Sequence, residues 1–354
     1  MKKTIFNKIK ELREEKKLLM REVASATQID QSLLSKFENG ERLPTKTQLL
    51  SLIRYFEADY NEMLILWLSD KLLSVVDEEE DLLIPAFHVA EEKIKYRRIS
   101  KSETIDLYLD KLSTIDSLLQ QLQGLRETDS YRIVEALDLE YTCESNRIEG
   151  STLTIKETDL VINEGLTISG KTMREHLEAI NHHEAILYIK DIIQNKLQLN
   201  ERTLLNIHSI ILRNIDRENA GRYRMVQVYI KGSKHIPPQP YMVQKEMEDY
   251  FIWYEKNKNR LHPVLLAAEM HERLVSIHPF IDGNGRTARL VMNLILLRSG
   301  YVIANIKGDS ENRLKYYNCL EKIQVSGEKK DFINFILDTE KVCLERYIEI
   351  LVKQ

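Results

Sequence analysis

Cysteine is scarce in this sequence, and long apolar runs are absent. The three cysteines are odd in number and widely spaced, which argues against a disulfide framework or a cysteine-based metal site: Cys143, Cys319 and Cys343. The longest apolar runs, such as Met63–Leu68, fall far short of the roughly 18 residues that a membrane span needs. Residues 2–8 carry charges but no apolar segment typical of a signal peptide. We therefore expect a cytoplasmic protein with reduced thiols and no membrane partner.

Proline and glycine are also sparse, with 7 and 12 residues in a chain of 354. Because both residues interrupt regular elements, their scarcity combined with long patterns of 3.6-residue period predicts a mainly helical fold. The length indicates two or three domains. A hydrophobic content of 43% with 30% charged residues is typical of a globular protein with an ample core.

The stretch from His278 to Arg289 has an unusual composition for a structural segment, because it places an imidazole, a carboxylate, two glycines and two arginines close together. Its centre allows a tight loop with converging backbone N–H groups at the start of a helix, an arrangement that binds anions: Gly283, Asn284 and Gly285. Arg286 and Arg289, three residues apart, share one helix face and offer two guanidinium groups to phosphate oxygens. The stretch therefore predicts a phosphate site.

The metal ligand and the general base of such a site are supplied by two residues that precede the loop, Asp282 and His278. Asp282 suits Mg²⁺, which typically takes one or two carboxylates together with substrate phosphates. His278 is the natural general base for a hydroxyl nucleophile near neutral pH. The alternative is a plain helix start capped by Asp282, with solvated arginines and a buried histidine, but the complete set of residue types favours the phosphate site.

These residues, His278 to Arg289, match the Fic-family motif HPFx(D/E)GNGRxxR at every position. The resemblance, which covers roughly residues 125–340, implies a helical-bundle core and an enzyme that transfers AMP from ATP to a Ser, Thr or Tyr hydroxyl of a target protein. It implies ATP and Mg²⁺ as cofactors, His278 as the catalytic residue and Asp282 on the metal. It also implies nucleotide contacts at Tyr316 and at Gln324, where animal members of the family have asparagine.

An upstream segment, residues 131–150, has the pattern of a helix that Gly150 ends. Ser145 and Glu149 lie four residues apart and therefore share one face of this helix. On its own this is an ordinary helix end with a solvated glutamate. The segment resembles the Fic inhibitory helix, with the signature (S/T)xxxE(G/N), which implies that Glu149 pairs with Arg289 and denies that arginine to the ATP γ-phosphate. Some relatives also use this glutamate to remove AMP from targets, and the sequence leaves that activity open.

The segment Val226–Ile230 has the clearest β-pattern of the chain, and a glycine-containing turn follows it. We expect one short β-hairpin here. In the Fic family this position is the flap that holds an extended segment of the target by backbone pairing. The resemblance places target docking at four residues of this flap: Ile230, Lys231, Gly232 and His235.

The N-terminal part predicts five short helices, and it resembles the XRE (Cro/repressor-like) helix-turn-helix. The resemblance implies a recognition helix that presents four side chains to DNA: Gln31, Ser32, Ser35 and Lys36. Met20 and Gln28 depart from the usual glutamine and glycine of that motif. Residues 1–75 carry 13 Lys and Arg against 11 Asp and Glu, which is a weak electrostatic footprint for a DNA-binding domain. A helix-turn-helix scaffold that serves protein interaction is therefore the alternative.

The sequence thus predicts three parts: a helix-turn-helix domain at 1–75, a linker with an amphipathic helix at 76–124, and a Fic domain at 125–354. The amphipathic helix either docks on the catalytic domain, which we favour, or pairs with a second copy to form a homodimer. The main functional prediction is an autoinhibited protein adenylyltransferase whose target protein is unknown. The alternatives are a DNA-binding transcriptional regulator that uses the Fic fold as a sensor or scaffold, and a toxin-like enzyme with another phosphate-containing donor.

Overall fold

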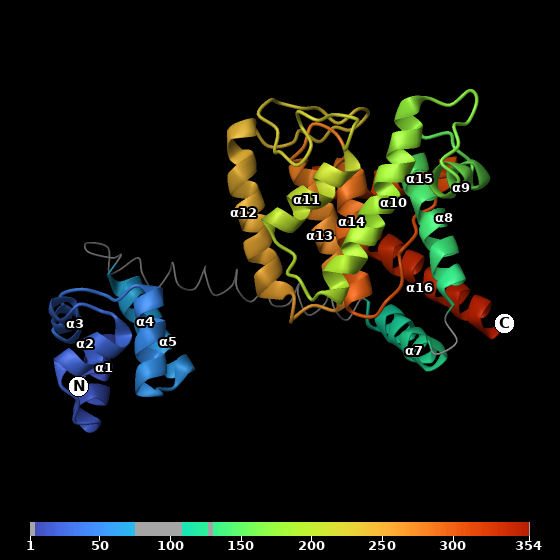
Figure 1. Ribbon diagram of the computed structural model, residues 1–354. Helices are drawn as coiled ribbons and strands as arrows, with labels where there is room; N and C mark the ends of the chain where they lie inside the picture. The colour runs from blue at the N-terminus through green and yellow to red at the C-terminus, as the bar shows by residue number, and fades with distance from the viewer. Residues whose placement is uncertain (1–3, 75–107, 127–129, 354) are drawn as a thin grey trace. The chain divides into compact units, whose positions relative to one another are not determined.

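The computed structural model describes residues 4–74, 108–126 and 130–353. These residues fall into two compact units, one within Met1–Thr104 and one within Ile105–Gln354 (Figure 1). Over the described ranges the chain forms fifteen helices and no strand. The mainly helical fold is therefore confirmed. The predicted linker, 76–124, lies outside the described residues as far as residue 107.

The N-terminal unit contains five helices: α1 (Ile5–Glu15), α2 (Met20–Thr27), α3 (Gln31–Glu38), α4 (Lys46–Phe56) and α5 (Tyr60–Leu73). Polar residues before four of them accept backbone N–H groups of the first turn, as Asp30 does from Ser32 at 2.8 Å. Apolar residues from all five helices meet in one core, in which Phe37 is fully buried. A bidentate pair between Arg13 and Glu38 ties α1 to α3, with both hydrogen bonds at 2.7 Å.

The larger unit contains ten described helices. They are α7 (Leu109–Leu125), α8 (Tyr131–Glu149), α9 (Ile155–Asn163), α10 (Met173–Gln194), α11 (Glu201–Ile211), α12 (Pro240–Asn257), α13 (Pro263–Ile277), α14 (Asn284–Arg298), α15 (Ser310–Ser326) and α16 (Lys330–Val352). Their ends follow local signals, because Pro263 opens α13 and Gly150, with φ of 108°, ends α8.

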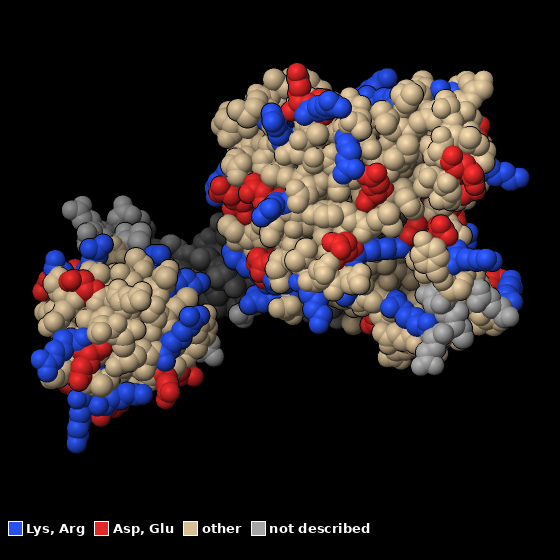
Figure 2. All heavy atoms as spheres, in the orientation of Figure 1, with Lys and Arg blue, Asp and Glu red and all other residues tan. Residues whose placement is uncertain are grey.

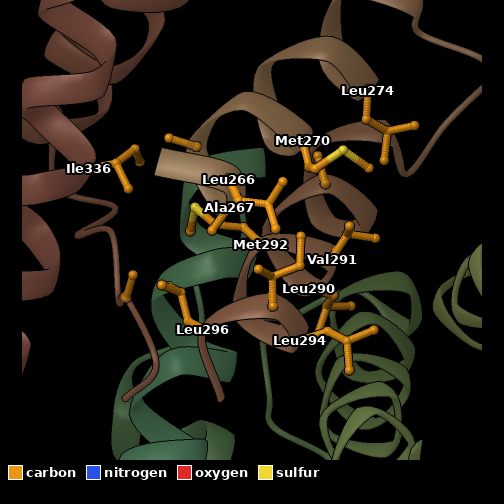
Figure 3. Close-up of a cluster of buried hydrophobic side chains, with 14 of the residues drawn as sticks. Leu266, Ala267, Met270, Leu274, Leu290, Val291, Met292, Leu294, Leu296 and Ile336 are labelled. Atoms are coloured by element: carbon orange, nitrogen blue, oxygen red, sulfur yellow. The ribbon is translucent and has the colours of Figure 1, made fainter. Parts of the chain in front are cut away.

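Helices α13 and α14 form the centre of this unit, and the segment between them is the His278 loop. Leu266, Met270 and Leu274 of α13 face the apolar residues of α14 (Figure 3). Helix α14 is buried around its whole circumference from Leu290 to Leu296, with exposed fractions of 0–4%. A helix that is apolar all round belongs in the core of a domain. The loop is therefore held between two helices that have little freedom to move.

The amphipathic helix predicted before the Fic domain is α7, and it packs on α16. Leu112, Ile115 and Leu122 of α7 are buried in the core of the larger unit. At the edge of this contact, Lys111 donates to Asp338 of α16 at 2.6 Å. The helix thus docks within the chain that carries it.

The surface charges carry both signs. Figure 2 shows Lys and Arg interspersed with Asp and Glu on both units over the face drawn. None of the described helices combines the length and the apolar composition that a membrane crossing requires.

Candidate active site

The loop after α13 is built by side chains that hold its backbone. Asn284 accepts from the Phe280 N–H at 3.0 Å and donates to the Phe280 carbonyl at 2.9 Å, so its amide shapes the loop. The His208 ring stacks on Phe280 with centroids 3.6 Å apart. Because the Gly221 N–H donates to His208 Nδ1, Nε2 carries the proton and donates to the Asp282 carbonyl at 2.9 Å. The loop is therefore preorganised before any ligand binds.

His278 lies at the C-terminal cap of α13 with φ of 50°, in the left-handed region. Its Nδ1–H donates to the Val275 carbonyl at 3.3 Å, and this leaves Nε2 as an acceptor. Burial lowers the pKa of His278 from its ordinary 6.5 to about 4. The imidazole is therefore neutral at physiological pH, which is the protonation state that a general base requires.

The carboxylate of Glu149 lies against the glycine loop at Gly285. A Cβ placed on Gly285 would lie 2.4 Å from Glu149 Oε1, so any larger residue would displace this carboxylate. Gly283 has φ of 78° and caps α14, with the helix N-terminus following it. The Glu149 carboxylate thus lies beside the start of this helix, where the helix dipole favours negative charge.

Arg289 is 1% exposed, and α8 supplies its partners. Its Nε donates to Ser145 Oγ at 3.0 Å, and its Nη2 donates to the Ser145 carbonyl at 2.9 Å and to Glu149 Oε1 at 2.7 Å. Burial alone would raise the pKa of Glu149, but Arg289 and Arg286 outweigh burial and hold it below its ordinary value. Burial alone would lower the pKa of Arg289, but Glu149 outweighs burial and raises it. The pair is therefore charged at neutral pH.

A second cluster of charges surrounds Arg286, which is 2% exposed. Its Nη1 lies 3.1 Å from Glu178 Oε1, and its Nη2 lies 3.2 Å from Asp282 Oδ1. Arg174 of α10 joins the same two carboxylates, with Nε 3.0 Å from Glu178 and Nη2 bonded to Asp282 Oδ2. The Gly283 N–H also donates to Asp282 Oδ1 at 2.6 Å. The site therefore alternates two arginines with two carboxylates.

The sequence of this chain was compared with protein-family models and with curated proteins. The Fic/DOC family model matches residues 198–296, which contain the loop and α14, and a helix-turn-helix model matches residues 9–62. The protein adenylyltransferase Fic of Drosophila persimilis is 34% identical over 241 residues, which are 67% of this chain and 46% of that protein. This chain carries a Fic domain joined to a helix-turn-helix domain. It spans about half the length of the relatives that it matches, since the Drosophila mojavensis protein is covered to 47%.

Solved structures share the fold of this Fic domain. Fic-1 of C. elegans aligns with a TM-score of 0.63 at 23% identity, covering 94% of this chain and 97% of that one. A Fic domain-containing signaling protein from Bacteroides thetaiotaomicron aligns with a TM-score of 0.60 at 29% identity, covering 69% of this chain and 96% of that one. The arrangement of helices around the loop is therefore that of Fic proteins.

The predicted β-hairpin flap of the Fic domain is wrong as a secondary structure, because residues 222–239 form no strand. The two arms are bridged by side chains instead: Arg224 donates to the carbonyls of Val226 at 3.0 Å and Pro238 at 2.6 Å, and Gln227 donates to Pro237 at 3.0 Å. The prolines have no N–H for a ladder, which explains the missing strands. The turn itself is present, with Ser233 N–H donating to the Ile230 carbonyl.

The four expected docking residues lie on this flap. Lys231 and Gly232 are exposed at its tip, and Ile230 is half-buried. His235 Nε2 bonds the Ser276 carbonyl at 2.7 Å, two residues before His278. The flap is therefore anchored to the end of α13.

The two residues expected to contact the nucleotide, Tyr316 and Gln324, are buried and half-buried. Tyr316 is 1% exposed, and its hydroxyl bonds His271 Nε2 at 2.9 Å. Its hydroxyl also interacts with the Arg289 guanidinium of the site, and the nucleotide contact at Tyr316 stays a prediction. Gln324 is half-buried, and its Nε2 is buried without a hydrogen-bond partner.

The four residues predicted to read DNA all lie on α3. Gln31, Ser32 and Lys36 are exposed, whereas Ser35 is half-buried. Gln28, which stands in place of the usual glycine, takes the left-handed conformation with φ of 56° at the end of α2. The turn geometry is therefore kept without the glycine.

Four residues support the Fic site without a signal in the sequence: Arg174, Glu178, His208 and Arg224. Arg224 is 1% exposed, and its Nε donates to the His278 carbonyl at 2.8 Å. Such residues are visible only through contacts between distant parts of the chain. A buried arginine within a polar segment gives no periodic pattern that would single it out.

Proposed function

We propose that this protein is an adenylyltransferase that moves AMP from ATP to a Ser, Thr or Tyr hydroxyl of a target protein. One observation supports the proposal most directly. His278 is neutral with Nε2 free to accept a proton, and the glycine loop that follows it leads into a helix carrying Arg286 and Arg289. Arg289 Nη1 is buried without a hydrogen-bond partner, and the same guanidinium interacts with the Tyr316 hydroxyl, so this side of the arginine can also donate to a bound phosphate. The relatives named protein adenylyltransferase, 34% identical to this chain, support the same activity.

The chain's own residues account for each part of the transfer. His278 Nε2 takes the proton of the target hydroxyl as the oxygen bonds to the α-phosphorus. The bond between the α-phosphorus and the bridging oxygen breaks, and pyrophosphate leaves with that electron pair. The glycine-loop N–H groups and the two arginines hold the charge that develops on the phosphates, where a buried site makes such contacts strong.

The donor set at Asp282 fits a single Mg²⁺. Its side chain is 39% exposed, and among the described residues no cluster of three or more His, Cys, Asp or Glu side chains could hold a metal alone. Mg²⁺ commonly binds through one carboxylate together with substrate phosphates, and it neutralises their charge when bound. Arg174 holds Asp282 Oδ2, so it must release that oxygen for the metal.

We also propose that the protein is autoinhibited by Glu149. Its carboxylate lies over Gly285 and on Arg289, where the terminal phosphate of ATP would bind. A carboxylate and a phosphate compete for the same donors and repel each other. Residues Ser145 and Glu149 would therefore keep the resting activity low.

The target is proposed to be an extended protein segment laid along the flap, at Ile230, Lys231, Gly232 and His235. The flap exposes apolar side chains beside this turn, with Met225 87% and Tyr229 76% exposed. Such side chains suit contact with another polypeptide.

Labelled ATP tests the proposed reaction. The Glu149→Gly protein is incubated with ATP labelled at the α position or at the γ position. We expect label in protein from the α position only, because AMP carries the α-phosphorus. Label that arrives only from the γ position would show phosphorylation, and label from neither would leave a sensor or scaffold role. Release of AMP from a pre-modified target by the parent protein, which keeps Glu149, would reveal an AMP-removing activity.

DNA binding by the N-terminal unit is a second proposed function. It is supported by the helix-turn-helix match and by the exposure of Gln31, Ser32 and Lys36 on α3. A gel-shift assay with selected DNA should show binding that Lys36→Glu weakens by about tenfold, since one phosphate contact is lost and a repulsive charge added. Equal binding by both proteins would favour the protein-interaction alternative.

A further inference from the structure

A cavity of about 210 Å³ lies in the larger unit away from the catalytic loop. Helix α8 contributes Val134 and Leu137 to its wall, and α14 contributes Leu297. No residue between His278 and Arg289 lines it. The volume is below the roughly 300–1,000 Å³ of sites for drug-sized molecules, so an occupant must be small.

The polar part of the wall is positively charged. Arg126, Lys190 and Arg346 line the cavity together with one carboxylate, Asp138. Asn305 adds a side-chain oxygen that is buried without a hydrogen-bond partner. An apolar wall with excess positive charge and a free acceptor fits an organic anion that also carries a hydroxyl donor.

The cavity lies between the far ends of the two helices that make the inhibitory contact. Glu149 ends α8 and Arg289 begins α14, whereas Val134 and Leu297 lie near the opposite ends of these helices. Helix α8 also contacts α10, as Figure 1 shows. From Asp138 to Glu149 the distance along α8 is about 16 Å, at about 1.5 Å per residue. A helix is stiff over this length, so a shift at the cavity reaches Glu149.

Two of the three cations of the cavity, Lys190 and Arg346, pair with carboxylates of α8. Lys190 of α10 pairs with Asp138 of α8. Arg346 of α16 holds Glu140 of α8 with contacts of 2.7 and 2.6 Å. An anion in the cavity would compete with these two carboxylates for the same donors. Its binding would therefore loosen α8 from α10 and α16.

We propose that this cavity binds a small aromatic hydroxy acid, whose binding loosens α8 and weakens the Glu149–Arg289 contact. The ring lies between the apolar residues of α8 and α14, the carboxylate meets Arg126, Lys190 and Arg346, and the hydroxyl donates to Asn305. The regulatory half of this inference rests on the proposed autoinhibition, but the binding site does not.

Calorimetry of the full chain with 4-hydroxybenzoate tests the site. We expect saturable binding that is about tenfold weaker in Arg126→Gln, because one charge-assisted contact is lost. Arg126 is exposed and bonds only the Gly300 carbonyl among the contacts of the described residues, so the variant should fold. The matched control is Arg132→Gln, which removes an exposed arginine of α8 outside the cavity and should bind as the parent does. Absence of binding, or equal binding of neutral 4-hydroxybenzyl alcohol, would overturn the site.

The same titration with Glu149→Gly tests the coupling without any activity measurement. Two linked sites change each other's affinity by the same factor. If the ligand loosens α8, removing one bond that holds this helix should tighten ligand binding, by about fivefold or more. Equal affinity in both proteins would overturn the regulatory role and leave the binding site. Failure of AMP transfer would affect neither result.

Discussion

Arg289 Nη2 donates to Glu149 Oε1 at 2.7 Å across 140 positions of the sequence, while Nη1 of the same guanidinium is buried without a hydrogen-bond partner. Nε and Nη2 of the arginine are thus held by α8, and the Tyr316 hydroxyl interacts with the same guanidinium. At Arg289, a competing phosphate need displace only the Glu149 carboxylate, because Ser145 holds Nε on the far side. On the proposed function, ligand binding therefore requires two changes: Glu149 must leave Arg289, and Arg174 must release Asp282.

Removing Glu149 should activate the protein. We expect Glu149→Gly to raise AMP incorporation by roughly 10- to 100-fold, because a hydrogen bond between charged groups contributes about 1.5–3 kcal/mol. The measurement is incorporation of α-labelled ATP into the protein and into a host lysate. Glu164→Gly, at an exposed glutamate that ends α9, is the matched control and should leave incorporation unchanged. Equal incorporation in all three proteins would refute the inhibitory role.

Replacing His278 should abolish transfer without unfolding the protein. His278 has φ of 50°, and asparagine tolerates this left-handed conformation better than alanine, so His278→Asn separates chemistry from strain. In the Glu149→Gly background we expect a loss of about 100- to 10,000-fold, the usual contribution of a general base. Thermal unfolding should stay within a few degrees of the parent. Activity within a factor of ten would remove His278 from the mechanism.

The pKa of His278 gives a prediction about pH. Burial lowers it from 6.5 to about 4, so the imidazole is neutral above pH 4 and takes up its proton only as the pH falls through that value. An NMR titration of the free protein should show almost no change in the His278 ring resonances between pH 8 and 6, with His278→Asn to assign them. A midpoint near the ordinary 6.5 would show that the ring is solvated.

Arg224 should prove essential for the flap. Its guanidinium donates to three carbonyls, those of His278, Val226 and Pro238, and Arg224→Met leaves them without this donor. Leaving buried acceptors unpaired should cost about 2–4 kcal/mol, which lowers the melting temperature of the larger unit by about 5–15 °C. The neighbouring exposed Arg222 gives the control Arg222→Met, which should change stability little. Calorimetric unfolding of both variants distinguishes the two outcomes.

Local chemistry made much of this protein predictable. The composition of the His278 loop, the helix stop at Gly150 and the helix start at Pro263 depend on residues that are neighbours in the chain. The mainly helical fold and the two family matches follow from such patterns, and both are confirmed. The pairing of Glu149 with Arg289 was predicted from the family resemblance, and the two side chains are hydrogen-bonded in the structure.

Other features depend on contacts that no local pattern records. Arg174 reaches Asp282 across 108 positions, and Arg224 reaches His278 across 54. The flap segment alternates like a strand, yet Arg224 and two prolines prevent the ladder. Tyr316 is buried against His271, and the nucleotide contact expected there stays a prediction. The sequence by itself therefore determined the helices and the catalytic loop, because short-range propensities and side-chain chemistry act there. Only the tertiary structure decided which charges meet, because burial and packing between distant helices select the partners.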